Sequence, residues 1–159
     1  MNTIVGVSDM EVSDNEDTTI ITYSLGSCIG VVIFDPVVHV GGLLHFMLPE
    51  SILDPAKADK NPYMFCDTGI PVLFKEAYKL GAQKRRMSVV VVGGSQVLDQ
   101  KGFFNIGKRN YLATRKIFWK NNVMIDYEDV GGMSNRTIKL AIKSGKIVMK
   151  ASDKGEIEI

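Results

Sequence analysis

The sequence of 159 residues is poor in cysteine and histidine, which limits its chemistry. Its two cysteines, Cys28 and Cys66, are too few for a disulfide framework, and we expect both to be reduced thiols. The two histidines, His39 and His45, lack the close spacing to the cysteines that indicates a metal site. The sequence therefore predicts neither a metal centre nor a cofactor.

An excess of charge and long apolar segments are also absent. The formal net charge of +1 gives no support for nucleic-acid or membrane binding by bulk electrostatics. No segment approaches the roughly 18 consecutive apolar residues of a membrane span. The N-terminus lacks a basic region followed by an apolar core, the mark of a secretory signal. We therefore expect a cytoplasmic protein that does not insert into a membrane.

The composition that is present is typical of one soluble globular domain. Apolar residues make up 45% of the chain and charged residues 23%. No linker, internal repeat or low-complexity block interrupts the sequence, which predicts a single domain over residues 1–159. Apolar residues at helical spacing predict one helix that begins near Thr68 and ends at Gly81, and a second from Ile106 to about Asn121.

Two apolar segments, residues 28–34 and 40–48, are separated by an Asp35-Pro36 turn signal and predict a β-hairpin. The first segment is apolar on both of its faces, so its sheet is expected to be covered on both sides within a layered structure. If the hairpin is centred between Pro36 and Val37, Cys28 lies directly opposite His45. Directly opposed side chains have Cβ atoms about 4.5–5.5 Å apart, and a slip of one residue would place them on opposite faces.

This arrangement predicts a nucleophilic cysteine. A thiol with an ordinary pKa of about 8.5 is activated by an imidazole or by backbone N–H groups. The small residues Gly26 and Ser27 before Cys28 allow N–H groups to converge on an oxyanion. The Thr22 hydroxyl, expected on the strand next to the hairpin, is a candidate to orient His45. The competing interpretation is packing, because single cysteines and histidines in buried strands are usually core residues. Their combination beside a small-residue turn favours a site for acyl transfer and hydrolysis.

At these residues the chain resembles the CheD family, the chemoreceptor glutamine deamidases of bacterial and archaeal chemotaxis. The resemblance covers nearly the whole chain and rests on the following segments: Leu25-Gly26-Ser27-Cys28, Asp35-Pro36, residues 41–49 around His45, Asp67-Thr68, Gly93-Gly94, residues 105–110, and Gly131-Gly132 with Arg136.

The resemblance implies a cysteine hydrolase that converts glutamine side chains of chemoreceptor cytoplasmic helices to glutamate. Cys28 would be its nucleophile, His45 its general base and acid, and Thr22 the third member of the triad. Some family members also act on receptor methyl esters. The implied fold is α+β, a layered α/β/β sandwich with mixed, mostly antiparallel sheets and two main helices, similar to bacterial toxin deamidases. A CheC-type phosphatase is the implied partner, and the alternative function is a non-catalytic module that docks on that phosphatase.

Three further features are interpreted as structural. Gly93-Gly94-Ser95 and residues 105–109 lack the spacing of a phosphate-binding loop, although a share in the substrate surface is an alternative. Cys66 is interpreted as a small buried residue. The polar segment 50–61, with its prolines as breakers, is expected to be a loop. Residues 123–127 are expected to form a strand, residues 11–17 an acidic, solvated stretch, and residues 151–159 a polar tail.

Overall fold

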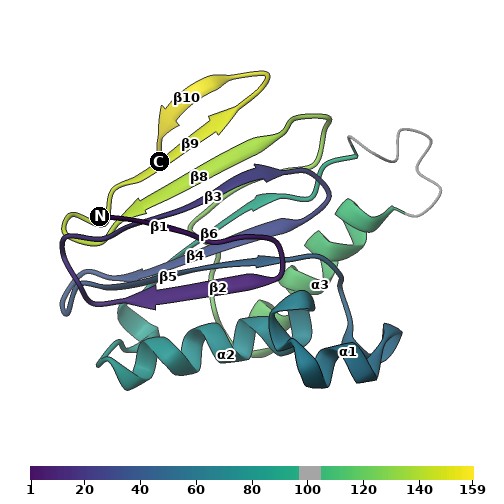
Figure 1. Cartoon of the computed structure of the whole chain (residues 1–159), viewed down its shortest axis with the longest axis horizontal. Helices are drawn as coiled ribbons and strands as arrows, with labels where there is room; N and C mark the ends of the chain where they lie inside the picture. The colour runs from purple at the N-terminus through teal and green to yellow at the C-terminus, as the bar shows by residue number, and fades with distance from the viewer. Residues whose placement is uncertain (97–104) are drawn as a thin grey trace.

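The computed structural model describes residues 1–96 and 105–159. Two five-stranded sheets lie face to face, and the helices cover the outer face of one of them (Figure 1). We call the sheet under the helices the helix-side sheet and the other the outer sheet. This order of helix layer, sheet and sheet confirms the predicted α+β fold with an α/β/β arrangement.

The helix-side sheet has the strand order β2-β5-β4-β6-β7 and the outer sheet the order β1-β3-β8-β9-β10. Parallel pairing joins β1 to β3 and β6 to β7, and the other described neighbours are antiparallel, so both sheets are mixed as predicted. The strands have the following bounds: β1 Asn2–Ile4, β2 Asp9–Ser13, β3 Thr19–Leu25, β4 Ile29–Asp35, β5 Val40–Phe46, β6 Ser88–Gly93, β7 Tyr127–Val130, β8 Arg136–Ala141, β9 Ile147–Ala151 and β10 Gly155–Glu158.

The two predicted helices are confirmed as α2 (Cys66–Lys79) and α3 (Ile106–Lys120). Gly81, with φ of +98°, follows α2 in the left-handed conformation that glycine adopts without strain. Short 3₁₀ helices are η1 (Ser51–Leu53), η2 (Pro62–Met64) and η3 (Lys84–Arg86). No helix in the described part of the chain is both long and apolar enough to cross a membrane.

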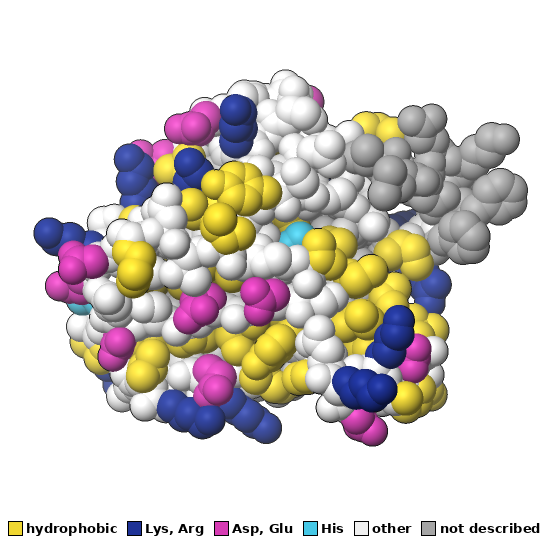
Figure 2. Space-filling view, in the orientation of Figure 1, with side chains coloured by type: hydrophobic (Ala, Val, Ile, Leu, Met, Phe, Trp, Pro, Cys, Tyr) yellow, Lys and Arg dark blue, Asp and Glu magenta, His cyan; other side chains and the backbone are white. Residues whose placement is uncertain are grey.

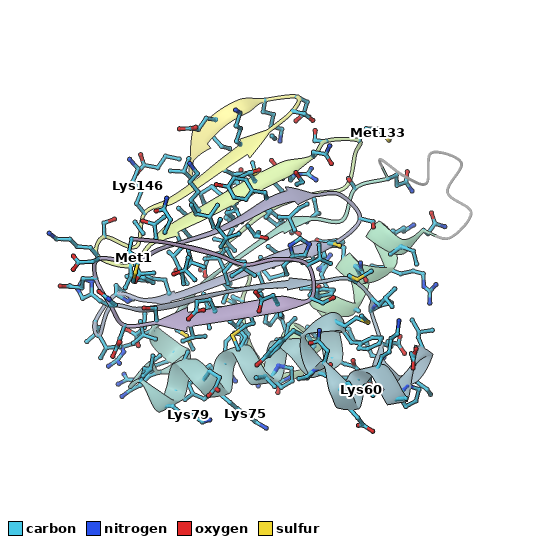
Figure 3. All side chains as sticks on the ribbon, in the orientation of Figure 1. Met1, Lys60, Lys75, Lys79, Met133 and Lys146 are labelled. Carbon is cyan, nitrogen blue, oxygen red and sulfur yellow. The ribbon has the colours of Figure 1, made fainter. Side chains whose placement is uncertain are left out.

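Strand β4 is buried on both faces, as predicted. Ile29, Val31 and Ile33 pack against the helices, whereas Val32 and Phe34 point into the space between the sheets. Figure 3 shows side chains from both sheets filling that space, while the labelled Lys75 and Lys79 of α2 point away from the sheets. The core therefore has two parts, one on each side of the helix-side sheet.

The hairpin of β4 and β5 has a different register from the predicted one. Gly30, rather than Cys28, lies opposite His45, because the four-residue connection Pro36–His39 moves the centre of the hairpin past Val37. His39 takes a φ of +52° in this turn. The displacement is two residues, so Cys28 stays on the same face as His45, at the diagonal position. The predicted direct opposition is wrong, but the predicted shared face is retained.

Three predictions about local structure are also wrong. Segment 50–61 contains α1 (Pro55–Lys60), because Asp54 caps it by accepting from Lys57 N, and proline fits the first helical position. The segment 123–127, predicted as a strand, precedes β7, which begins at Tyr127. The acidic N-terminal segment contains edge strand β2, and the C-terminal tail adds β10 beside β9. Pairing with a neighbouring strand, not local pattern, forms these two strands.

Candidate active site

The carbonyl groups of the turn between β3 and β4 point toward the end of β6 and toward α3. Three successive carbonyls accept hydrogen bonds: Gly26 O from Ser95 N at 2.9 Å, Ser27 O from Asn110 Nδ2 at 3.0 Å, and Cys28 O from Gly94 N at 2.8 Å. A trans peptide is planar, with its N–H opposite its C=O. The N–H groups of Ser27 and Cys28 therefore point away from β6 and α3, where they are free to donate to an oxyanion.

Cys28 lies at the end of this turn, with its side chain packed against the core between the sheets. It is a free thiol and is partly exposed. Burial raises the pKa of the Cys28 thiol to about 11, and the backbone N–H of Cys28 itself opposes the increase. The thiol is consequently protonated at neutral pH and needs a base to become a nucleophile.

His45 is held by a hydrogen-bond chain that crosses the space between the sheets. Thr22 Oγ1 lies 2.8 Å from His45 Nδ1 and donates its own proton to Val5 O at 2.7 Å. Because a hydroxyl has one proton, Thr22 must accept from Nδ1–H, which leaves the Nε2 lone pair of a neutral His45 free. Thr22 belongs to β3 of the outer sheet, so our expectation of a strand adjacent to the hairpin is corrected to a strand facing it.

The environment keeps His45 neutral. Its side chain is 1% exposed, and burial lowers its pKa to about 4, opposed by the carboxylate of Asp9 on the paired strand β2. The Nε2 atom is buried and has no hydrogen-bond partner among the described residues. A neutral imidazole with an unpartnered Nε2 is the form that accepts a proton.

The predicted site residues meet at one end of the space between the sheets. Cys28 and His45 share a face at diagonal positions, and Thr22 approaches His45 from the opposite sheet. Within the described residues, no hydrogen bond joins the Cys28 sulfur to His45. Diagonal neighbours lie roughly 7–8 Å apart, and catalytic hydrogen bonds are often long before substrate binds. Gly26 and Ser27 shape the turn through their backbone groups.

Three contributors to the site were missed from the sequence. Val5 accepts the Thr22 proton, Ser8 N donates to His45 O at 2.8 Å, and Asn110 holds the turn from α3. Val5 and Ser8 flank the point where the chain crosses from β1 in one sheet to β2 in the other. Their roles depend on backbone atoms, which leave no signature in residue type.

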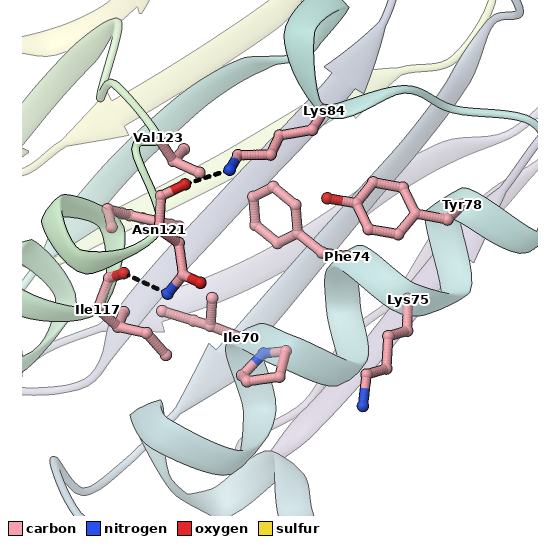
Figure 4. Close-up of a pocket in the computed structure, with 10 residues that line it drawn as sticks. Ile70, Phe74, Lys75, Tyr78, Lys84, Ile117, Asn121 and Val123 are labelled. Atoms are coloured by element: carbon pink, nitrogen blue, oxygen red, sulfur yellow. Dashed lines mark hydrogen bonds between the residues drawn. The ribbon is translucent and has the colours of Figure 1, made fainter.

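A pocket lies between α2 and α3, away from Cys28 and His45 (Figure 4). Ile70 and Phe74 form part of its apolar wall, and Asn121 Nδ2 donates to Ile117 O at 2.7 Å at its edge. None of the predicted site residues lines this pocket. Among the residues with described positions, no group of three or more histidine, cysteine or acidic side chains is placed to hold a metal ion.

Comparisons with known proteins agree with the resemblance. The family model described as "CheD chemotactic sensory transduction" matches residues 47–151. Relatives named probable chemoreceptor glutamine deamidase include one from Syntrophus aciditrophicus, 56% identical over 94% of this chain and 93% of its own length. The relative from Solibacter usitatus is 47% identical over 95% of this chain and 89% of its own length. The relative from Pyrococcus horikoshii is 37% identical over 96% of this chain and 94% of its own length.

A solved structure is more distant. The crystal structure of a Neisseria meningitidis protein of the DUF152 family has a TM-score of 0.48 and 10% identity, covering 83% of this chain and 64% of that chain. A similarity at this level carries no conclusion. The family-model match begins after Thr22, Cys28 and His45, so the roles of these three residues rest on geometry. The family match and the three relatives together show that the chain belongs to the CheD family.

Proposed function

We propose that the protein is a chemoreceptor glutamine deamidase, which hydrolyses specific glutamine side chains to glutamate with release of ammonia. The names of its relatives support this substrate. The observation that carries the proposed chemistry is the Thr22–His45 hydrogen bond, because it leaves Nε2 free as a base on the face shared with Cys28.

In the first half of the reaction, the Cys28 sulfur attacks the carboxamide carbon while His45 Nε2 takes the thiol proton. The carbonyl oxygen becomes an oxyanion, and the N–H groups of Ser27 and Cys28 are the donors that stabilise it. His45 then gives its proton to the leaving nitrogen as the C–N bond breaks. Ammonia departs, and a thioester joins Cys28 to the substrate.

In the second half, water attacks the thioester carbon and His45 Nε2 takes a proton from that water. A second oxyanion forms in the same place and collapses as the C–S bond breaks. The proton returns from His45 to the Cys28 sulfur, which restores the starting state. The net reaction consumes one water and needs no cofactor, because base, nucleophile and oxyanion donors are all protein groups.

Exposed apolar side chains beside the site suit a helical substrate. Figure 2 shows hydrophobic side chains on the face that carries the β1–β2 connection. In this connection Val7 is 58% exposed, and Val5 and Ser8 on either side contact Thr22 and His45. A receptor helix that presents a glutamine also presents apolar neighbours, for which such a surface is a match.

The family resemblance adds a CheC-type phosphatase as partner and the cytoplasm, where receptor signalling helices lie, as the place of action. Docking of such a phosphatase does not need the thiol. Calorimetric titration of a CheC-type phosphatase into the Cys28→Ala protein is therefore expected to give the wild-type affinity. If the phosphatase binds neither the wild-type nor the Cys28→Ala protein, it is not a partner.

The test of the enzymatic function is incubation with chemoreceptor cytoplasmic fragments, followed by peptide mapping for glutamine-to-glutamate mass changes. Wild-type protein is expected to convert specific glutamines, and Cys28→Ala to convert none. Cys66→Ala is the matched control, because Cys66 is a buried thiol in contact with Thr114 and outside the site. Full conversion by Cys28→Ala would contradict the mechanism, and no conversion by any protein would favour the binding module.

A further inference from the structure

Asn110 on α3 ties together the two chain segments that carry the thiol and the imidazole. Its side chain is fully buried, and its Nδ2 donates to Ser27 O at 3.0 Å and to Met47 O at 2.8 Å. Ser27 directly precedes Cys28, and Met47 follows the end of β5 just after His45. One amide group therefore fixes the position of both segments relative to α3.

The first of these hydrogen bonds sets the direction of a backbone donor. With Ser27 O held by Asn110, the planar peptide points the Cys28 N–H to the opposite side. In residues 1–96 and 105–159, this N–H interacts with the Cys28 sulfur itself. The N–H is therefore available beside the reacting atom, where the oxyanion develops.

The asparagine at this position makes two hydrogen bonds but also has an energetic cost. Its Oδ1 is buried without a partner among the described residues, which costs about 1–3 kcal/mol for an unpaired acceptor. The two carbonyls leave no choice of amide orientation, because Oδ1 in place of Nδ2 would face both of them. The neighbouring buried positions on α3 are Gly107, Thr114 and Phe118. An apolar side chain at position 110 would avoid the unpaired Oδ1, but it would leave the carbonyls of Ser27 and Met47 without their donor.

We infer that Asn110 is a positioning residue of the deamidase, an inference that rests on the proposed function. It acts through the Ser27 carbonyl to aim the Cys28 N–H at the oxyanion, and through the Met47 carbonyl to hold the His45 segment at a fixed distance from the thiol. Asn110 itself does not touch the substrate.

The test compares Asn110→Ala with Thr114→Val. Thr114 is fully buried on the same helix face, and its hydroxyl donates to Asn110 O at 2.8 Å. Its other hydrogen-bond partner among the described residues is Cys66 Sγ, not the carbonyl of Ser27 or Met47. Asn110→Ala is expected to lower kcat roughly 10- to 100-fold with little change in KM, somewhat less than loss of an oxyanion donor itself. Thr114→Val is expected to keep the wild-type kcat and KM.

A second readout needs no substrate. The rate of Cys28 alkylation by iodoacetamide is followed against pH, with the modified site identified by mass spectrometry. Asn110→Ala is expected to shift this profile to higher pH, because the Cys28 N–H no longer favours the thiolate. Thr114→Val should leave the profile in place. This shift is expected even if the wild-type protein deamidates no receptor, so failure of the proposed function is distinguishable from failure of this inference.

A third variant covers the case in which Asn110→Ala fails to fold. Asn110→Asp keeps the shape but loses both donors when ionised, and protonation returns one of them. Its kcat is expected to be low at neutral pH and to recover as the pH falls, relative to wild type. A purely structural role predicts a lowered Tm with wild-type kcat and an unshifted alkylation profile in every folded Asn110 variant, and that result would overturn the inference.

Discussion

At the scale of single residues, Thr22 decides which nitrogen of His45 is free. Thr22→Val keeps the shape of the side chain but leaves His45 Nδ1–H and Val5 O without their buried partner. An unpaired buried polar group costs about 1–3 kcal/mol, so kcat is expected to fall by roughly 10- to 100-fold. Steady-state kinetics of ammonia release measure this change.

Thr22→Ser is the matched control, since it restores the hydroxyl and removes a methyl group. It should keep most of the wild-type kcat, with its main effect on stability. Equal kcat for Thr22→Val and wild type would show that Thr22 does not orient His45.

His45 also makes the stability depend on pH. Its pKa falls from 6.5 to about 4 on folding, so below pH 6.5 the unfolded chain binds the proton more readily than the folded one. The stabilisation is complete above pH 6.5 and is lost as the pH falls toward 4. Between pH 7 and pH 5 the free energy of unfolding should fall by about 2 kcal/mol through this group.

Urea unfolding at the two pH values, in wild type and His45→Gln, isolates this contribution. The variant has no imidazole to titrate, so its loss between pH 7 and pH 5 should be smaller by about 2 kcal/mol. Parallel losses in the two proteins would mean that His45 is not buried in its neutral form.

At the scale of elements, β6 approaches the turn before β4 so closely that only glycine fits at Gly93. Its φ is +111°, and a Cβ there would clash with Cys28 O. Gly93→Ala must therefore displace either β6 or the turn. We expect kcat to fall more than about tenfold, as small displacements of catalytic groups have large effects.

Gly155→Ala separates this clash from the strain of a positive φ. Gly155 has φ of +73° in the distant β9–β10 turn, with nothing within 4 Å of an added Cβ. This variant should lose about 1–2 kcal/mol of stability and keep wild-type kcat. If the two alanine variants behave alike in kinetics, the contact with Cys28 does not matter.

The elements also show what the sequence could predict. The pattern of apolar residues predicted β4, β5, α2 and α3, because these elements carry the buried side chains in their own sequences. Strands β2 and β10 were missed, since edge strands depend on a neighbour for their hydrogen bonds. The prolines that bound α1 were interpreted as breakers, although proline also begins helices.

The proximity of the three candidate site residues was predictable from the sequence, but the register of the hairpin was not. Cys28, His45 and Thr22 do lie together. Side chains alternate between the two faces of a strand, so a displacement of two residues leaves Cys28 on the same face as His45. The sheet to which Thr22 belongs depends on long-range topology. Asn110 could not be predicted, since its partners are backbone carbonyls that only the folded chain brings to it.

At the scale of the whole molecule, Arg136 joins the two sheets beside the site. From β8 in the outer sheet it donates to Gly93 O at 3.1 Å, and to Asp129 Oδ1 of the helix-side sheet at 2.9 Å. Burial alone would raise the pKa of Asp129, but Lys154 and Arg136 outweigh it, and the pKa is lowered. The carboxylate therefore stays charged, and its two oxygens accept hydrogen bonds from Arg136 Nη2 and Lys154 Nζ.

Arg136→Met is expected to destabilise the protein by about 3 kcal/mol, because it removes one partner of a buried pair. Lys146→Met is the control, since the Lys146–Glu158 pair is exposed at both ends and exposed pairs contribute about 0–1 kcal/mol. Urea unfolding at pH 7 compares the two. Similar small losses would show that the sheets are held together without Arg136.

The central claim is that Cys28 forms a thioester with a receptor glutamine under base catalysis by His45. The most direct measurement is intact-protein mass spectrometry of an acid-quenched reaction with a receptor fragment. We predict an adduct of the wild-type protein that maps to Cys28 and is lost on further incubation, with none in Cys28→Ala. Deamidation that proceeds without any adduct on Cys28, and at the same rate in Cys28→Ala, would contradict the claim.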